Sequence, residues 1–162
     1  MILKDKVAIV TGAAQGVGRG EALALAKEGA SVLVVDVNET AAIETVGLIS
    51  AAGGKGMHAV CDVRVRAEVD RAVSIAIEAF GGVDILVNNA QIIPAPAPFE
   101  TWTEETMRGA YESGVLGTFH FMQACFPSMK QRGGGRIINT ASASGHGVCA
   151  VSYTHLRAHE TS

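Results

Sequence analysis

A glycine-rich segment near the start of the chain has the residue types and spacing of a loop that binds phosphate. Residues 11–18 read TGAAQGVG and follow a short apolar run. Gly12 permits a tight turn, Gly16 lets the backbone approach a pyrophosphate, and Gly18 lets a helix pack closely on a sheet. A phosphate here would meet the N-terminus of that helix, where unpaired N–H groups and the helix dipole favour an anion. The segment predicts a site for the pyrophosphate of a dinucleotide.

An aspartate at the end of the next apolar run could bind the ribose of the same ligand. Asp36 closes the run SVLVVD and lies 18 residues after Gly18. Its carboxylate could accept hydrogen bonds from both ribose hydroxyls. It would repel the 2′-phosphate of NADP, and neither Val37 nor Asn38 supplies a neutralising cation. The sequence therefore predicts NAD in preference to NADP. Three glycines can also form a simple turn, but the strand before them, the helix after them and Asp36 together favour the binding loop.

Alternating strands and helices must position these residues. Apolar periodicity predicts strands at 7–10, 31–36, 57–60, 83–87 and 136–139, and helices at 16–28, 42–52, 69–80 and 103–132, with Pro127 bending the last turns of the last helix. Because βα crossovers are right-handed, this alternation gives a parallel sheet with helices on both faces. The predicted fold class is α/β, a Rossmann-type doubly wound sheet that is incomplete, with about five strands. We expect one dinucleotide-binding domain over residues 1–150.

Composition excludes several classes of function. The net charge is −3 and no Lys/Arg cluster is present, so nucleic acid is not an expected partner. No apolar run approaches the ~20 residues that a membrane-spanning helix needs, so no membrane partner is expected. The N-terminal residues MILKDK show no export signal, and Cys61, Cys125 and Cys149 have the odd count and unpaired spacing of reduced thiols. We therefore expect a soluble, cytoplasmic protein.

Two further motifs follow the glycine loop in order, each after a predicted strand. Cys61-Asp62-Val63 follows the third strand and Asn88-Asn89-Ala90 follows the fourth. With these motifs, residues 5 to about 148 resemble the short-chain dehydrogenase/reductase family. The resemblance implies that Asp62 and Val63 flank the adenine and that Asn89 lies beside the nicotinamide ribose. Asp62 could equally be a helix cap, and Asn89 an amide that shapes its loop. The predicted cofactor-binding residues are Gly12, Gln15, Gly16, Val17, Gly18, Asp36, Asp62, Val63, Asn89 and Ala90.

The segment after the fifth predicted strand resembles the family's serine motif. Residues 139–145 read NTASASG, similar to Asn-x-Ser-Ser-x-x-Gly, which places Ser142 at the catalytic serine position. Its hydroxyl would hold the substrate oxygen. Ser144 is the competing assignment, and serines in such a loop can also be simple turn formers.

The family's acid/base pair does not follow at the usual spacing. The resemblance implies hydride transfer between the nicotinamide and an alcohol or carbonyl carbon, with a tyrosine that exchanges the proton and a lysine that lowers the tyrosine pKa. The position 13 residues after Ser142 holds His155. Tyr153 lies two residues earlier, and four residues after Tyr153 an arginine, Arg157, stands in place of the lysine. A planar guanidinium would address the ribose differently from an ammonium. One interpretation is a truncated NAD-dependent alcohol dehydrogenase or ketoreductase, acting on a small alcohol or ketone and inactive as this fragment. The alternative is a non-catalytic NAD-binding module.

The resemblance carries further expectations. Residues 151–162 look like the non-native tail found at the ends of metagenomic gene fragments. We expect no metal, although Cys149, His155 and His159 could be considered as ligands. The family's later strands, helices and substrate lid are absent, which would leave the fifth strand as an exposed edge. The parent enzyme is expected to be a homo-oligomer built largely on the long helix.

Two residues depart from the family pattern inside the matching region. Gln91 replaces the glycine of Asn-Asn-Ala-Gly, and Gly114 stands where the long helix commonly carries an asparagine. The second change removes an amide that distorts the helix backbone and holds water. We therefore expect the family's usual proton relay to be altered.

Overall fold

A five-stranded parallel sheet forms the centre of the molecule. The computed structural model describes residues 1–142, and the expectations for Ser144, Cys149, the acid/base segment and the tail concern residues outside that range. The strands are β1 (Val7–Thr11), β2 (Ser31–Asp36), β3 (Lys55–Val60), β4 (Ile85–Asn88) and β5 (Arg136–Asn139), in the spatial order β3-β2-β1-β4-β5. All four neighbouring pairs are parallel, as the βα alternation predicts.

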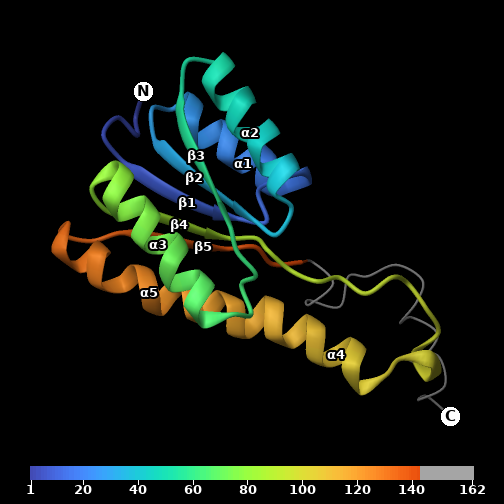
Figure 1. The fold of residues 1–162 in the computed structure, drawn as a ribbon. Helices are drawn as coiled ribbons and strands as arrows, with labels where there is room; N and C mark the ends of the chain where they lie inside the picture. The colour runs from blue at the N-terminus through green and yellow to red at the C-terminus, as the bar shows by residue number, and fades with distance from the viewer. Residues whose placement is uncertain (143–162) are drawn as a thin grey trace, which may run out of the picture.

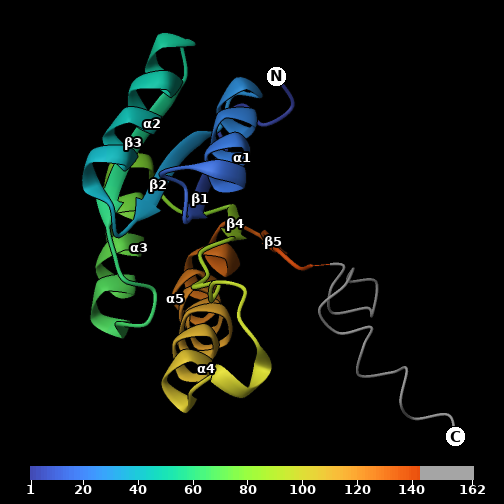
Figure 2. The ribbon, with the colours of Figure 1, turned by 90° about the vertical axis from the view of Figure 1, so that its right-hand side faces the viewer.

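Helices cover both faces of the sheet (Figure 1). They are α1 (Gly16–Lys27), α2 (Glu39–Ala51), α3 (Arg66–Phe80), α4 (Glu104–Tyr111) and α5 (Gly117–Gln131), with a short 3-10 turn η1 (Phe99–Thr101) before α4. Helices α1 and α2 lie on one face, and α3 and α5 lie on the other (Figure 2). The predicted α/β doubly wound class is confirmed.

Alternate residues of the strands supply the two halves of the core. Ala8 and Val34 pack with residues of α1 and α2, whereas Ile9, Leu33 and Val35 pack with residues of α3 and α5. All five side chains are buried. Strands that are covered on both faces need apolar residues at every position, which explains why the sequence shows continuous apolar runs and no alternation.

The order of the strands creates a switch point at the carboxyl ends of β1 and β4. The chain moves outward from β1 through β2 to β3, then returns to pair β4 on the other side of β1. The loops after β1 and β4 therefore diverge to opposite faces. In open α/β sheets, ligands bind in the crevice that this divergence leaves.

The long helix predicted over 103–132 is interrupted. Its α-helical parts, α4 and α5, are separated by the π-helical segment η2 (Glu112–Leu116). Gly114 lies within this segment, so the helix backbone is distorted here although position 114 carries no asparagine amide. The Ser113 hydroxyl stabilises the segment, because it donates to the Gly109 carbonyl oxygen at 2.8 Å and accepts from the Ile92 N–H at 2.9 Å.

Strand bounds differ from the expectation where tertiary pairing overrides local pattern. β3 begins at Lys55 instead of Met57, because Lys55 and Gly56 pair in register with β2. β4 begins at Ile85 instead of Val83, because the Val83 N–H donates to the Ser128 hydroxyl of α5 at 3.0 Å and not to a neighbouring strand. In both cases the residues that decide where the strand begins are far away in sequence.

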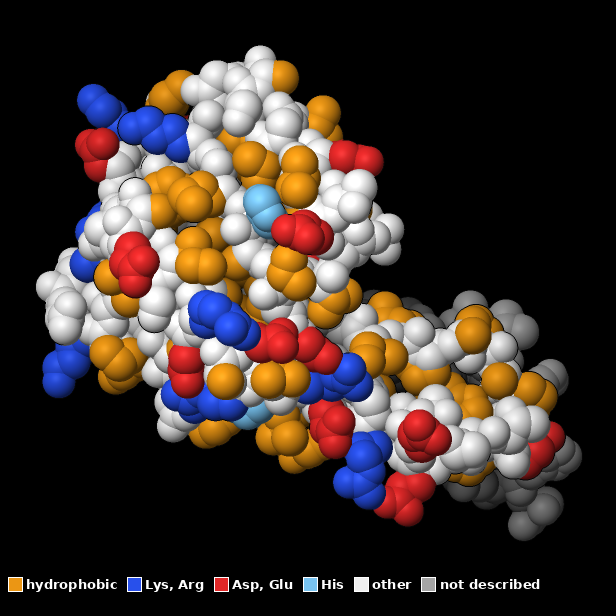
Figure 3. Space-filling view, viewed as in Figure 1, with side chains coloured by type: hydrophobic (Ala, Val, Ile, Leu, Met, Phe, Trp, Pro, Cys, Tyr) orange, Lys and Arg blue, Asp and Glu red, His pale blue; other side chains and the backbone are white. Residues whose placement is uncertain are grey.

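The surface over α3 and α4 carries mixed charge. Acidic and basic side chains alternate there on the face seen in Figure 3. The pairs Arg66–Asp70 and Arg108–Glu104 contribute, each four residues apart on a helix. Among the helices of residues 1–142, none has the length and apolar character that crossing a membrane requires.

Candidate dinucleotide-binding site

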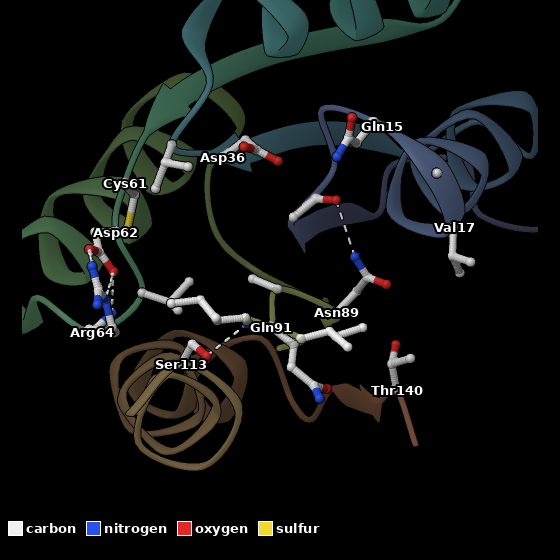
Figure 4. A pocket seen from close by; sticks show the side chains of 17 residues that line it. Gln15, Val17, Asp36, Cys61, Asp62, Arg64, Asn89, Gln91, Ser113 and Thr140 are labelled. Carbon is white, nitrogen blue, oxygen red and sulfur yellow. Dashed lines mark hydrogen bonds and ion pairs between the residues drawn. The ribbon is translucent and has the colours of Figure 1, made fainter. Parts of the chain in front are cut away.

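A cavity of about 530 Å³ opens at the carboxyl ends of the strands, at the switch point (Figure 4). Its walls come from the loops after β1, β2, β3 and β4, from η2 and from the residue after β5. The structure brings to it the predicted residues Gly12, Gln15, Gly16, Val17, Asp36, Asp62, Val63, Asn89 and Ala90. Gly18, the remaining member of the predicted cofactor set, is buried behind the loop.

Close packing explains two glycines of the loop. A Cβ on Gly18 would lie 2.3 Å from the Gly12 carbonyl oxygen and 2.5 Å from Asn89 Nδ2. A Cβ on Gly12, whose φ is +64°, would lie 2.9 Å from Ala90 Cα. The loop therefore touches both helix α1 and the loop after β4, with no room for side chains.

Gly16 differs, because space above it is open. Its φ is +56°, which disfavours other residues, but no atom lies within 4 Å of the Cβ position. Gly16 is also the first residue of α1, and the N-cap residue Gln15 makes no side-chain cap. The N-terminus of α1 therefore lies at the cavity wall without a side-chain cap, which is the arrangement that suits an anion.

Asp36 is held toward the glycine loop at the end of β2. Its Oδ2 accepts from the Ala14 N–H and its Oδ1 accepts from the Asn38 N–H, both at 3.0 Å. The side chain stays half-exposed and lines the cavity. Figure 4 shows it beside Gln15. Each oxygen keeps a further lone pair for a ligand hydroxyl.

Asn89 ties the loop after β4 to the glycine loop. Its side-chain amide donates to the carbonyl oxygens of Thr11 at 3.0 Å and Gly12 at 3.1 Å. The Thr11 hydroxyl accepts from the backbone N–H groups of Asn89 and Ala90, both at 3.0 Å. The interpretation of Asn89 as a loop-shaping amide is confirmed. Thr11 is a positioning residue that the motif contained but that we did not single out.

Asp62 forms a turn with an arginine. The Arg64 backbone N–H and guanidinium both donate to its carboxylate, with a shortest contact of 2.6 Å. These hydrogen bonds, which outweigh burial, lower the pKa of Asp62. The N-cap of α3 is Val65, so the helix-cap interpretation of Asp62 is wrong. Arg64 lines the cavity and was missed, although an arginine two residues after an aspartate is a detectable signal.

Cys61 lines the cavity as a buried thiol. Burial, reinforced by the charges of Glu68 and Asp62, raises its pKa to about 12. Burial raises the pKa of Cys125 to about 12 as well. Both thiols therefore stay protonated at neutral pH and are poor nucleophiles.

Polar residues that sequence reasoning did not assign to the site gather at the end of the cavity near β4 and β5. They are Gln91, Ser113 and Thr140. Thr140 is held by its N–H, which donates to the Asn88 carbonyl oxygen at 2.9 Å. Ser142 lies two residues further on; it is exposed and is not among the residues that line the cavity.

Comparison with known proteins identifies the family. The model of the short chain dehydrogenase family matches residues 6–154. The chain is 38% identical over 158 residues to 7alpha-hydroxysteroid dehydrogenase of Escherichia coli K12, covering 96% of this chain and 61% of the relative. It is 42% identical over 147 residues to galactitol 2-dehydrogenase of Agrobacterium fabrum, covering 90% of this chain and 56% of the relative.

A solved structure has the same fold. It is a 7alpha-hydroxysteroid dehydrogenase complexed with NADH and 7-oxo glycochenodeoxycholic acid, with a TM-score of 0.86 and 38% identity, over 94% of this chain and 58% of that chain. The present chain thus spans little more than half the length of the relatives it matches. Fold, motif order and sequence identity agree, and the chain belongs to the short-chain dehydrogenase family.

Proposed function

We propose that this chain binds a nicotinamide dinucleotide in the cavity and forms the cofactor half of an NAD-dependent oxidoreductase that interconverts an alcohol and a ketone. The observation that carries the proposal is that the glycine loop, Asp36 and Asn89 line one cavity at the switch point. Membership of a nicotinamide-dependent family supports it. The solved relative that binds NADH supports it as well.

The residues present fit a dinucleotide from end to end. The open first turn of α1 suits the pyrophosphate, and Asp36 suits the hydroxyls of the adenosine ribose. Asp62 and Val63 would flank the adenine, while Asn89 and Ala90 would border the nicotinamide riboside. The closely packed backbones of the Gly12 loop and of the loop after β4 would hold the two halves at a fixed spacing.

The electrostatics favour NAD over NADP. Asp36 would repel a 2′-phosphate, and two arginines near it have other partners. The Arg19 guanidinium bonds the Ala14 carbonyl oxygen, the Thr45 hydroxyl at 2.9 Å and the Glu44 carboxylate at 3.3 Å. Arg64 is paired with Asp62. Among the described residues, both cations are thus already neutralised or committed to protein oxygens.

The chemistry of the whole protein follows from the family. The bound nicotinamide would supply or accept the hydride. Ser142 is proposed to hold the oxygen of the substrate, from the segment that follows β5. The relatives are named for a steroid and for a sugar alcohol, so we propose a small alcohol or ketone without a narrower class. Hydride transfer also needs an acid/base group, which the sequence does not place at the usual position 155.

That departure favours a second candidate function, a non-catalytic NAD-binding module. At the usual spacing the acid/base pair would fall at positions 155 and 159, which hold His155 and His159, so the chain could bind the cofactor without turnover. Reduction of added ketones by NADH, followed at the absorbance of NADH, distinguishes the two candidates. Turnover above the uncatalysed rate contradicts the binding module; cofactor binding without turnover supports it.

We also propose that the full-length protein forms a homo-oligomer through the long helix. Its outer side carries large apolar side chains at about helical spacing, each more than half exposed: Met107, Tyr111, Val115, Phe119 and Phe126. Apolar stripes of this size are typical of contact surfaces. Sedimentation of the full-length protein tests this, and a monomer at micromolar concentration contradicts it.

Titration calorimetry with NAD, NADP and ADP-ribose tests cofactor binding. We expect NAD to bind more tightly than NADP. Asp36→Ala should lower the affinity for NAD by about 10- to 100-fold, the effect of losing charge-assisted hydrogen bonds, and change that for NADP far less. Asp36→Asn keeps the shape of the side chain and removes its charge, so it shows how much of the affinity depends on the charge. Asp70→Ala, which removes an exposed carboxylate on α3, is the matched control.

Two outcomes would overturn parts of the proposal. Equal loss of NAD and NADP affinity in Asp36→Ala contradicts the ribose assignment. Failure of the folded wild-type chain to bind any of the three ligands contradicts dinucleotide binding itself.

A further inference from the structure

The side chain of Gln91 lies across the backbone of Gly114. Its Cγ and Cδ lie 3.7 and 3.8 Å from the position that a Cβ on Gly114 would occupy. Figure 4 shows the Gln91 side chain pointing between the helix and Thr140. Two positions at which this chain departs from its family, 91 and 114, are therefore neighbours at the cavity wall. A Cβ at position 114 would fit in ordinary van der Waals contact with the glutamine, whereas a larger side chain would compete with it for space.

Hydrogen bonds at both ends of its short segment fix the Gln91 backbone. On one side, the N–H groups of Asn89 and Ala90 donate to the Thr11 hydroxyl at 3.0 Å. On the other side, the Ile92 N–H donates to the Ser113 hydroxyl at 2.9 Å. Gln91 lies between these anchors, so its side chain is held at the wall of the cavity, next to η2.

The Asn89 amide and the Ser113 hydroxyl at this end of the cavity are already committed. The Asn89 amide donates to the Thr11 and Gly12 carbonyl oxygens, and the Ser113 hydroxyl donates to the Gly109 carbonyl oxygen. The Gln91 carboxamide has no hydrogen-bond partner among residues 1–142 and is exposed to the cavity. It offers two N–H donors and one carbonyl acceptor.

We propose that Gln91 binds the nicotinamide end of the dinucleotide through its carboxamide. The inference rests on the proposed dinucleotide binding. Asp36 and the first turn of α1 suit the adenosine and pyrophosphate, so the nicotinamide riboside would extend toward the remaining part of the cavity, which Asn89 and Gln91 line. The carboxamide of nicotinamide also carries both donors and an acceptor, so two such groups can pair.

A change of charge at Gln91 tests this contact without requiring turnover. The nicotinamide ring is positively charged in NAD⁺ and neutral in NADH. Gln91→Glu keeps the shape and adds a negative charge, so it should tighten NAD⁺ relative to NADH by about threefold or more, because unit charges a few ångströms apart still attract appreciably near water. Binding of ADP-ribose, which lacks nicotinamide, should stay unchanged. Gln131→Glu adds the same charge on an exposed residue outside the cavity and is the control.

Two further variants separate binding from packing. Gln91→Ala should weaken NAD⁺ and NADH about three- to tenfold and leave ADP-ribose unaffected. Gly114→Val would press the outer atoms of a branched side chain against Gln91 and should have the same effect, whereas Gly114→Ala adds a Cβ that fits and should have little effect. In the double variant the losses should not add, because both remove one contact.

The ligand set distinguishes failure of this inference from failure of the proposed function. If every variant binds ADP-ribose and Gln91→Glu leaves the NAD⁺/NADH affinity ratio unchanged, the inference is overturned while dinucleotide binding stands. If the folded wild-type chain does not bind ADP-ribose or NAD⁺, the proposed function fails and this inference fails with it.

Discussion

Two aspartates at opposite ends of the same sheet have different surroundings. Asp84, at the amino end of β4, is 6% exposed, and its carboxylate accepts from the Val7 N–H at 2.9 Å and from the Arg132 guanidinium at 2.8 and 3.0 Å. Lys6 lies 3.5 Å away. Asp36, at the carboxyl end of β2, accepts one N–H on each oxygen and faces the cavity.

The difference shows how a structural carboxylate is told from a binding one. The partners of Asp84 come from β1 and from the C-terminal end of α5, so one side chain joins elements far apart in sequence. Burial alone would raise its pKa, but the hydrogen bonds from Arg132 and Val7 and the charges of Arg132 and Lys6 lower it below the ordinary value. Asp36 has local partners and a free side that faces the ligand. The protein itself supplies the hydrogen-bond partners of Asp84, whereas a ligand would supply the remaining partners of Asp36.

The largest effect on stability should come from Asp84. Asp84→Ala leaves the Val7 N–H and the Arg132 guanidinium without their acceptor and should lower the free energy of unfolding by about 3 kcal/mol. Asp36→Ala should lower it by only about 1 kcal/mol, because the exposed Asn38 N–H can turn to water and only the N–H of the buried Ala14 loses its acceptor. Urea denaturation followed by circular dichroism measures both. Equal losses of unfolding free energy in the two variants would contradict this difference between Asp84 and Asp36.

Adding a side chain in the closely packed glycine loop should lower the stability somewhat less than Asp84→Ala does. Gly18→Ala places a Cβ 2.3 Å from the Gly12 carbonyl oxygen, so the loop must shift, with a loss of about 1–3 kcal/mol and weaker dinucleotide binding. Gly20→Ala lies on the same helix with no atom within 4 Å of its Cβ position and should stabilise the protein by about 0.5–1 kcal/mol. Thermal melting of both variants checks the contrast; a neutral Gly18→Ala would contradict the close packing.

Lowering the pH should remove the part of the stability that comes from the charge of Asp84. Because the pKa of Asp84 is lowered from 3.8 in the folded protein, its stabilisation is fully present above that value and is lost as the pH falls through the folded pKa. The difference in unfolding free energy between wild type and Asp84→Asn should therefore shrink on going from about pH 6 to about pH 3. A constant difference over this range would mean that the charge of Asp84 contributes nothing.

The smallest effect should come from the Asp62–Arg64 pair. The pKa of Asp62 is also lowered, first by the hydrogen bonds from the Arg64 side chain, but both groups are partly exposed to solvent. Screening by water limits such a pair to less than about 1 kcal/mol. Arg64→Met should change the melting temperature little, and addition of salt should reduce even that change. A loss as large as that of Asp84→Ala would place Asp62 with the structural carboxylates.

Local pattern was sufficient for much of the fold. The bounds of β2 and β5 match the predicted runs at 31–36 and 136–139, because apolar residues form the middle of each strand and polar or turn-forming residues mark its ends. The exposed edge expected at β5 is present among the described residues, where Ile138 is 48% exposed. The π-helical interruption was not predictable in this way, since it depends on a hydroxyl that bonds to a loop 21 residues away.

The sequence by itself determined the binding motifs, because each lies within a few residues of a strand end, and parallel strands bring those ends to one edge of the sheet. The glycine loop, Asp36, the Asp62 segment and Asn89 were predictable for that reason. Only the tertiary structure decided that Gln91 lies on Gly114 and that Asp84 meets Arg132. Those contacts depend on how the long helix packs against the sheet. Helix packing brings together residues that are far apart in sequence, and no local pattern of residue types predicts which of them will meet.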